Sequence, residues 1–350
     1  MSIINIFKSV IMKNFLKVPK NLIFHVTFRC NSHCVTCFNW KKIAKQEKEK
    51  ELKLDEIKKI ALSLGKLDSL GISGGEPFLR EDLPEICKIF YETNKINSLI
   101  IPTNGSMPEI VEKQIKKILK YCNCNVSLIL SLDGTKEIHN KIRGIDCFDS
   151  VLKTYKLVEQ IKDKRFSIRV ASTVFEENYK DLLVLDEFIR KEMPSVRFHN
   201  FELMRGDQKE KLILPNIKEL EWFKEQIFEI WEHYSFYKNK TESRLVLGIK
   251  KFLFDFYIKT LKEKRQIIPC YAGQVWGVLE AYGDVYFCEL LGSIGNIKEY
   301  NYDFGKIWNN EKASKMREFI KNKKCYCTHS CFQISNVLNN PLLWPKVFSS

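Results

Sequence analysis

The chain has 350 residues, of which 45% are hydrophobic and 29% charged, and its formal net charge is +14. This mixture is typical of a globular protein with one large core and a smaller one, and it excludes a disordered chain. The excess of lysine is compatible with an anionic partner or with a lysine-rich composition alone, and no nucleic acid is expected because no nucleic-acid-binding module is recognisable.

The N-terminal extension, residues 1–20, contains a short amphipathic pattern. Apolar residues within 3–16 recur on one helical face, with lysines elsewhere. Such a helix is compatible with packing on its own domain or with peripheral contact to a membrane. We find no signal peptide and no apolar run long enough to span a bilayer. We therefore expect a cytoplasmic protein, or one peripheral to the membrane, whose twelve cysteines are thiols or metal ligands rather than disulfides.

Residues 21–203 alternate between strand-like and helix-like segments. Strands are expected at 22–28, 69–73, 98–102, 126–132, 166–173 and 196–201, and helices at 54–64, 82–92, 109–120, 148–162 and 181–192. This order predicts an α/β fold with a parallel sheet and crossover helices. Polar and glycine-rich segments follow several strands, so they are expected to meet at one mouth, at the carboxyl ends of the strands. The charged stretch Lys41–Lys53 is expected to be solvated.

In the last third of the chain the regular alternation of strands and helices is not continued. Residues 204–265 are expected to form a helical bridge rich in Lys, Glu and aromatic residues. Residues 266–335 contain a hairpin-like pattern around Gln274–Glu289 and a helix near 311–322. Residues 336–350 form a C-terminal tail.

Three cysteines follow the first expected strand. Cys30, Cys34 and Cys37 have C-x3-C-x2-C spacing. Three thiolates can hold three corners of a [4Fe-4S] cluster and leave the fourth iron open to an outside ligand, which is typical of a reaction centre. A structural zinc site is the alternative, because His25 or His33 could supply a fourth ligand.

The segment Ser73–Arg80, Ser-Gly-Gly-Glu-Pro-Phe-Leu-Arg, follows the second expected strand, and its glycines let the backbone approach a ligand closely. Together with the cysteine loop it resembles the radical SAM superfamily, over most of residues 20–203 and into the last third of the chain. The resemblance implies a partial (β/α)6 barrel similar to a TIM barrel, with a [4Fe-4S] cluster on the three cysteines. It also implies that the amino and carboxylate groups of S-adenosylmethionine (SAM) bind the open iron. The candidate contacts of the amino group are Gly74, Gly75 and Glu76.

Further segments match the same family. They are Leu52–Ile57, Thr103–Gly105, Ser131–Gly134 and His139–Gly144. By resemblance, Ser131 and Asp133 lie near the SAM ribose, and Arg143 lies near the mouth, where it can hold a carboxylate or the substrate. Asn104 belongs to the same candidate group. A turn or a helix cap is the alternative role of Ser131 and Asp133.

Two positions carry a weaker signal. For His139 a hydrogen-bonded loop histidine is favoured over a catalytic role. The family usually has an aromatic residue just before the third cysteine, where it neighbours adenine. Here that residue is Thr36, and Phe38 follows the cysteine instead. Phe38 is therefore the aromatic candidate for a cofactor contact.

A second cysteine set lies in the last third. Cys270 and Cys288 have C-x12-G-x4-C spacing, and Cys325, Cys327 and Cys331 follow. A hairpin that brings the first pair together needs the glycine at its turn. The pattern resembles the Twitch/SPASM extension of radical SAM enzymes, which binds auxiliary [4Fe-4S] clusters. Because only five cysteines are present, we expect one auxiliary cluster on Cys270, Cys288, Cys327 and Cys331, with Cys325 as the alternate; a zinc ribbon is the alternative site.

The remaining four cysteines lie in or beside expected helices and strands. They are Cys87, Cys122, Cys124 and Cys147. We expect them to be small buried apolar residues. Cys122 and Cys124 are separated by one residue, but no partners for a third site are visible.

The resemblance implies an enzyme that takes an electron from a flavodoxin or ferredoxin-type donor and reductively cleaves SAM to a 5′-deoxyadenosyl radical, which abstracts hydrogen from the substrate. We expect a small anionic or sugar-like substrate and an oxidation, dehydrogenation or epimerisation, because one auxiliary cluster suits a small metabolite and the charge favours an anion. The first alternative is maturation of a ribosomally made peptide or protein, although residues 1–20 are too short for a leader-binding module. A tRNA-modifying enzyme would carry an RNA-binding domain, which is not visible. A non-catalytic zinc-binding interaction protein is the alternative outside enzymes.

Overall fold

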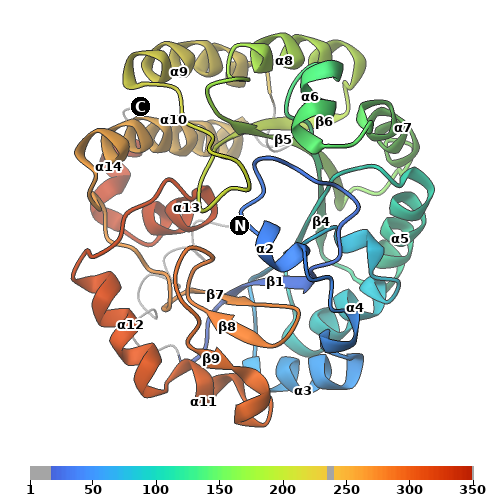
Figure 1. Ribbon diagram of the computed structural model, residues 1–350, viewed down its shortest axis with the longest axis vertical. Helices are drawn as coiled ribbons and strands as arrows, with labels where there is room; N and C mark the ends of the chain where they lie inside the picture. Colours follow the sequence, from blue (N-terminus) through green and yellow to red (C-terminus); the bar gives the residue numbers. More distant parts are fainter. Residues whose placement is uncertain (1–16, 235–239, 349–350) are drawn as a thin grey trace.

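The computed structural model describes residues 17–234 and 240–348, in which helices surround a sheet of nine strands (Figure 1). The helix expected within 3–16 lies outside the described residues. The strand order is β6-β5-β4-β3-β2-β1-β7-β8-β9. The strands are β1 (Asn21–Thr27), β2 (Ser69–Gly74), β3 (Ser98–Thr103), β4 (Asn125–Ser131), β5 (Phe166–Val174), β6 (Val196–Leu203), β7 (Trp276–Leu279), β8 (Asp284–Tyr286) and β9 (Gly295–Asn296).

The first six strands are all parallel, and a helix follows each of the first five on the outside of the sheet (Figure 1). These helices are α3 (Leu54–Leu64), α4 (Leu83–Asn94), α5 (Pro108–Tyr121), α7 (Phe148–Val158) and α8 (Asp181–Glu192). The predicted partial (β/α)6 barrel is thereby confirmed. Leu70 and Ile72 of β2 are fully buried beneath the helices. Ser69, Gly71 and Ser73 alternate with them and are half-buried, so small side chains line the barrel interior along this strand.

Three short elements were not expected. Helix α6 (Lys136–Arg143) lies between β4 and α7, and the stretch Lys41–Lys53 contains α2 (Trp40–Ile43) and the 3-10 turn η2 (Lys48–Lys50). The expectation that the stretch Lys41–Lys53 is solvated is wrong near its end, at Glu51. Glu51 is buried there and accepts hydrogen bonds from the Arg29 and Thr27 side chains, because the chain passes beneath the first cysteine loop.

The C-terminal part continues the barrel sheet. Strand β7 pairs in parallel with β1, and the hairpin β7–β8 turns at Gly283, whose φ of +100° favours glycine. Residues Leu22–Phe24 are therefore hydrogen-bonded on both sides, to β2 and to β7. The expected hairpin around Gln274–Glu289 is confirmed.

The remaining helices close the ring between β6 and the hairpin (Figure 1). They are α9 (Ile217–Glu232), α10 (Lys240–Glu263), α11 (Phe304–Trp308), α12 (Glu311–Lys321), α13 (Ser330–Leu338) and α14 (Trp344–Phe348). Their buried side chains belong to the same hydrophobic core as the barrel, and Trp308 and Phe287 are fully buried within it. Among the described residues, no helix has the length and apolar character that crossing a membrane requires.

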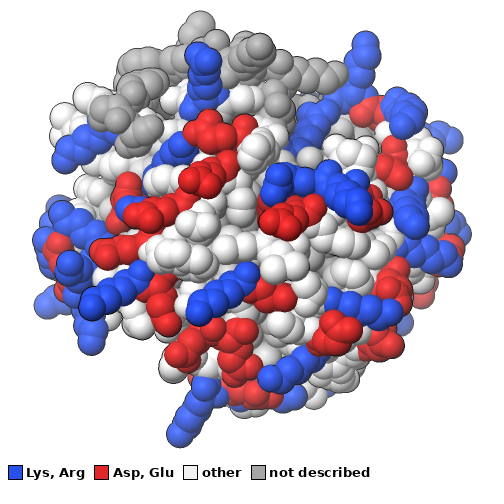
Figure 2. Space-filling view, turned by 90° about the horizontal axis from the view of Figure 1, so that it is seen from above, with Lys and Arg blue, Asp and Glu red and all other residues white. Residues whose placement is uncertain are grey.

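The high net charge is distributed rather than concentrated on the face shown in Figure 2. Lysine and arginine side chains alternate there with aspartate and glutamate. Lys224 pairs with Asp255 at 2.9 Å, and Lys141 with Glu177 at 3.1 Å. Exposed pairs of this kind contribute little to stability, so this face gives no reason for the excess of positive charge.

Candidate active site

The first cysteine loop leaves the carboxyl end of β1 and docks on the end of β2. The backbone N–H of Gly75 donates to the Thr27 carbonyl at 2.8 Å, and that of Glu76 donates to the Arg29 carbonyl at 2.9 Å. A Cβ atom on Gly74 or Gly75 would lie 2.1 Å from the Thr27 or the Arg29 carbonyl oxygen, respectively. Glycine is therefore needed at both positions for the two chains to touch.

The opposite side of the loop rests on α6. The backbone N–H groups of His33 and Val35 donate to the carbonyls of Arg143 and Ile142, at 2.9 and 3.0 Å. The Arg143 guanidinium also lies 3.7 Å from the Cys34 sulfur. Burial works to lower the pKa of Arg143, but the nearby negative groups outweigh it and raise the pKa, so the guanidinium is a permanent cation beside the thiols.

Asp133 holds this arginine in place. Its Oδ2 lies 2.7 Å from Arg143 Nη2, and its Oδ1 accepts from the backbone N–H of Thr173 at 2.7 Å. Asp133 is fully buried, as is His139, whose Nδ1 accepts from the Asp133 N–H at 3.1 Å. Both carboxylate oxygens of Asp133 thus have protein partners, and its contact with the SAM ribose stays a prediction. His139 lies on helix α6 rather than in a loop, with both ring nitrogens in contact with neighbours.

Asn104 supports the loop through side-chain hydrogen bonds. Its amide donates to Asn31 Oδ1 at 2.8 Å and to Ser32 Oγ at 2.9 Å. Its own Oδ1 accepts from Ser106. Asn104 therefore positions the residues directly after Cys30, and a direct cofactor contact stays a prediction.

Glu76 lies beneath this network and is buried. Its carboxylate accepts from Thr103 Oγ1 at 2.9 Å and from the backbone N–H groups of Asn104 at 2.7 Å and Phe78 at 3.2 Å. Burial raises the pKa of Glu76 to about 7, although these hydrogen bonds act in the other direction. The carboxylate links the ends of β2 and β3 across the mouth.

The two remaining cofactor candidates are Ser131 and Phe38, which lie on different segments of the chain. Ser131 is half-buried at the last position of β4. The Phe38 ring lies 5.6 Å from the Arg205 guanidinium, close enough for a cation–π contact. Phe38 therefore packs against a residue that follows β6.

The three thiols of the loop are half-buried. Burial raises the pKa of Cys30 to about 12 and that of Cys37 to about 11, and the neighbouring thiols act in the same direction. Among residues 17–234 and 240–348, no three His, Cys, Asp or Glu side chains converge as a single metal ion would require. A four-iron cluster binds each thiolate through a different iron, so three thiols on one backbone-anchored loop beside a fixed guanidinium fit it. Cys30, Cys34 and Cys37 would hold this cluster, which supplies the electron and the open iron for SAM.

The second cysteine set flanks the hairpin. Cys270 precedes β7, Cys288 follows β8, and Cys325 and Cys327 lie in the segment before α13. Burial raises the pKa of Cys270 to about 11 and that of Cys288 well above its usual value, and the Cys327 thiol adds to both shifts. These thiols are thus electrostatic neighbours, as ligands of one cluster must be. Cys331 is more accessible than the others and its charged neighbours are Glu202, Arg205, Glu289 and Lys250.

A buried His–Glu–His network joins the two parts of the protein. Glu289, next to Cys288, accepts from His25 Nε2 at 2.8 Å and contacts His329 Nε2 with its other oxygen. Burial acts to raise the pKa of Glu289, but the two histidines outweigh it and hold the pKa well below the usual range. His25 belongs to β1, so the auxiliary segment is tied to the barrel by side chains as well as by the sheet.

Two cations have Cys331 of the second cysteine set among their charged neighbours. Arg205 follows β6 and lies 3.9 Å from Glu202, with its Nε buried and unpartnered. Lys250 of α10 donates to Asn200 Oδ1 at 2.6 Å and, within the described chain, forms no ion pair with a carboxylate. Burial lowers the pKa of Lys250. A negatively charged ligand bound beside the Arg205 guanidinium and the Lys250 ammonium would be attracted by both.

Two family models match the chain. The model of the radical SAM superfamily matches residues 24–189, and that of the SPASM iron–sulfur cluster-binding domain matches residues 270–332. The chain therefore contains a radical SAM domain followed by a SPASM iron–sulfur domain. These domains imply a SAM-binding [4Fe-4S] cluster followed by an auxiliary iron–sulfur site.

Similar proteins agree with this assignment. The chain is 28% identical to the AdoMet-dependent heme synthase of Methanosarcina barkeri over 339 residues, which cover 89% of each protein. It is 35% identical to the GTP 3′,8-cyclase of Clostridium acetobutylicum over 56% of this chain and 60% of that protein. The fold resembles Streptococcus suis SuiB bound to S-adenosylmethionine, with a TM-score of 0.59 and 16% identity over 90% of this chain and 71% of SuiB.

The sequence did not identify several residues of this radical SAM site. Arg205, Lys250 and Glu289 come from segments without a recognisable motif. The position of Glu289, next to Cys288, was the one available signal for it. Arg80 ends the segment Ser73–Arg80, yet its role appears only in the structure, where its side chain donates to the carbonyls of Val26 and Leu52.

Proposed function

We propose that this radical SAM protein is an oxidoreductase-type enzyme that reductively cleaves SAM and abstracts hydrogen from a small anionic substrate. Cys30, Cys34 and Cys37 hold the SAM-binding cluster, and a flavodoxin or ferredoxin-type protein supplies the electron. Four of the five C-terminal cysteines would hold one auxiliary cluster, which would supply an electron acceptor for an oxidation or dehydrogenation.

The observation that carries the anionic substrate is the pair Arg205 and Lys250. Arg205 packs on Phe38, directly after Cys37, and both cations have Cys331 of the second cysteine set among their charged neighbours. Lys250 forms no ion pair among the described residues, and the contact of Arg205 with Glu202 is a loose 3.9 Å, so a bound carboxylate or phosphate would stabilise both cations. The names of the similar proteins support the idea, because GTP carries phosphates and heme carries carboxylates.

The test of the reaction type is anaerobic reconstitution followed by incubation with SAM and dithionite. We expect 5′-deoxyadenosine to form in the wild type and to fall to background in a Cys30→Ala/Cys34→Ala/Cys37→Ala variant. A chain that binds zinc rather than iron in this loop, or that forms as much 5′-deoxyadenosine without the three thiols, would contradict the proposal. Deuterated GTP, iron porphyrin carboxylates, sugar alcohols and peptides then form the substrate panel, with deuterium transfer into 5′-deoxyadenosine as the readout.

Arg205→Gln and Lys250→Gln test the anion site. With the substrate that transfers deuterium, we expect each to raise KM by roughly tenfold to a hundredfold, since a charge-assisted hydrogen bond is worth about 1.5–3 kcal/mol. Substrate-free SAM cleavage should change little. Lys251→Gln is the matched control, because Lys251 is the next residue on α10 and pairs with Glu232 instead. An equal effect of all three substitutions would show that only overall charge matters.

A further inference from the structure

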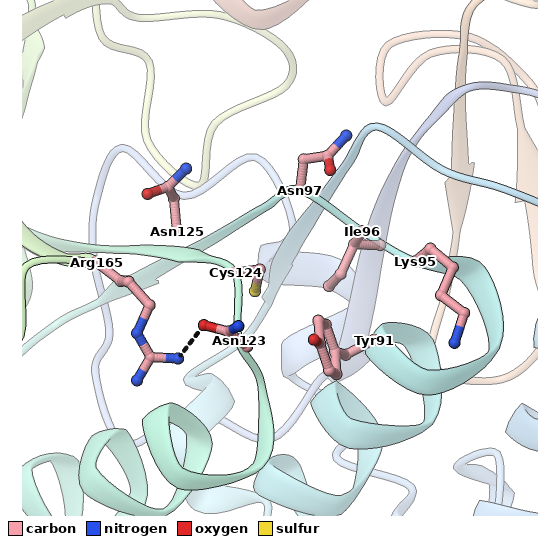
Figure 3. A pocket seen from close by; sticks show the side chains of 8 residues that line it. All are labelled: Tyr91, Lys95, Ile96, Asn97, Asn123, Cys124, Asn125 and Arg165. Atoms are coloured by element: carbon pink, nitrogen blue, oxygen red, sulfur yellow. Dashed lines mark hydrogen bonds between the residues drawn. The ribbon is translucent and has the colours of Figure 1, made fainter.

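A concave site lies at the starting ends of the barrel strands, whereas the first cysteine loop leaves the carboxyl end of β1; Figure 3 shows the residues that line this site. It has a volume of about 450 Å³ and lies where β3, β4 and β5 begin. The proposed reaction uses none of the residues that line it. They are Tyr91, Lys95, Ile96, Asn97, Asn123, Cys124, Asn125 and Arg165.

Two thiols meet at the floor of this hollow. Cys124 lines it and is 5% exposed, whereas Cys122 lies behind it and is fully buried. Cys122 has an extended backbone, with φ of −119° and ψ of 118°, so its side chain and that of the residue two positions later project to the same side. Each thiol is the largest influence on the pKa of the other, so the two side chains are close neighbours. The expectation that both are buried is confirmed, but they are partners rather than isolated apolar side chains.

Arg165 fixes the loop that carries the pair. Its guanidinium donates to the Cys122 carbonyl at 2.8 Å, to the Leu119 carbonyl at 3.0 Å and to Asn123 Oδ1 at 3.1 Å (Figure 3). Asp163 pairs with the same guanidinium and holds it in place. The segment from the end of α5 to the start of β4 is therefore anchored around the two sulfurs.

The electrostatics distinguish the two sulfurs. The contact with Cys122 lowers the pKa of Cys124, burial opposes this, and the charge of Arg165 lowers the pKa further. The same contact raises the pKa of Cys122. Cys124, at the accessible floor, thus has the greater thiolate character, and Cys122 remains a thiol beside it.

We propose that Cys122 and Cys124 form a reversible redox-modification site, which an oxidant of the peroxide class converts to a disulfide. The Cys124 thiolate attacks hydrogen peroxide, an S–O bond forms as the O–O bond breaks, and hydroxide leaves. The Cys122 sulfur then displaces the new hydroxyl group and its proton leaves with it as water, so two thiols and one peroxide give one disulfide and two waters. A dithiol such as dithiothreitol reverses the change, because a disulfide that spans a single residue is strained and easily reduced.

The test treats the reconstituted full-length protein with limiting hydrogen peroxide, then alkylates it under denaturing conditions and digests it with trypsin. Fragment 121–136 contains Cys122 and Cys124 as its only cysteines, whereas Cys87 lies in fragment 81–88 and Cys147 in fragment 144–153. We expect fragment 121–136 to lose two hydrogens and resist alkylation, with recovery after dithiothreitol. The buried Cys147 is the internal control and should stay alkylatable.

Arg165 gives an independent readout. Arg165→Gln should slow formation of the disulfide by roughly tenfold through a smaller thiolate fraction, and Arg165→Lys should restore part of the rate. In Cys122→Ser, dimedone should trap a sulfenic acid on Cys124. The proposal is overturned if fragment 121–136 stays fully alkylatable at peroxide levels that oxidise Cys147, or if Cys124 instead links to Cys87 in fragment 81–88.

Discussion

His139 illustrates how a single buried side chain couples this site to pH. Its Nδ1 accepts from the Asp133 N–H, and its Nε2 lies 3.3 Å from the Cys147 sulfur. Burial lowers the pKa of His139 to about 3, and the charge of Arg143 adds to the shift. The ring is therefore neutral in the folded protein at any pH at which the fold persists.

This gives a pH-dependent stability with a defined sign. Below about pH 6.5 the unfolded chain binds a proton at this histidine and the folded chain does not, so the free energy of unfolding falls as the pH falls. Between pH 7 and pH 5 the loss should be roughly 2 kcal/mol. His139→Asn keeps an acceptor for the Asp133 N–H and should remove this slope while lowering overall stability. Urea unfolding at several pH values measures it; an unchanged slope in the variant would assign the pH dependence to other groups.

At the residue scale, the sequence predicted identities better than contacts. Cys30, Glu76 and Arg143 were recognised because each stands in a motif with fixed spacing. That Asp133 pairs with Arg143, and that Arg143 reaches Cys34, could not be predicted, because these contacts depend on how α6 lies against the loop. Arg205 follows β6 and Lys250 lies on α10, and spacing in the sequence cannot relate these two segments to each other.

At the scale of elements, the contact between the ends of β1 and β2 determines the shape of the cluster loop. A Cβ on Gly75 would lie 2.1 Å from the Arg29 carbonyl, whereas one on Gly71 of the same strand would meet Ile23 Cγ1 at an ordinary 3.7 Å. A side chain can therefore be accommodated at position 71 but not at position 75 without a shift of the backbone.

We expect Gly75→Ala to lower iron incorporation substantially, because the backbone of the loop must move away from β2 before the thiols can be placed. Gly71→Ala should retain the wild-type iron content, since its Cβ meets only an ordinary van der Waals contact. Iron and acid-labile sulfide per chain after reconstitution measure the effect, with circular dichroism to confirm folding. If Gly75→Ala loads iron as fully as Gly71→Ala, close backbone approach is not what places the cysteines.

The α/β alternation was predictable because the expected strands and helices have distinct periods and lie near the helices and strands observed. Helix α6 was missed because it has only eight residues and most of them are polar, although Thr135 and Gly144 at its ends are typical capping residues. The pairing of β7 with β1 was also missed, since 248 residues lie between the end of β1 and the start of β7 and local pattern does not report such pairing.

At the scale of the whole molecule, the C-terminal part and the barrel share one sheet, to which the C-terminal part contributes β7, β8 and β9. Removal of residues 266–350 would expose the edge of β1 and the apolar surface that Trp308 and Phe287 cover. We expect a chain of residues 1–265 to aggregate or to lose its cooperative unfolding transition. Size-exclusion chromatography and thermal unfolding followed by circular dichroism check this; a monomer with a sharp transition would show that the barrel folds independently.

The shared strand β1 also has a consequence for electron flow. The loop with Cys30 leaves one end of this strand, while Cys270 and Cys288 flank the hairpin that is hydrogen-bonded along its side. Both redox centres are thus mounted on one rigid frame. Since tunnelling rates fall steeply with separation, a backbone that holds the distance between two such clusters constant would also hold the rate of electron transfer between them constant.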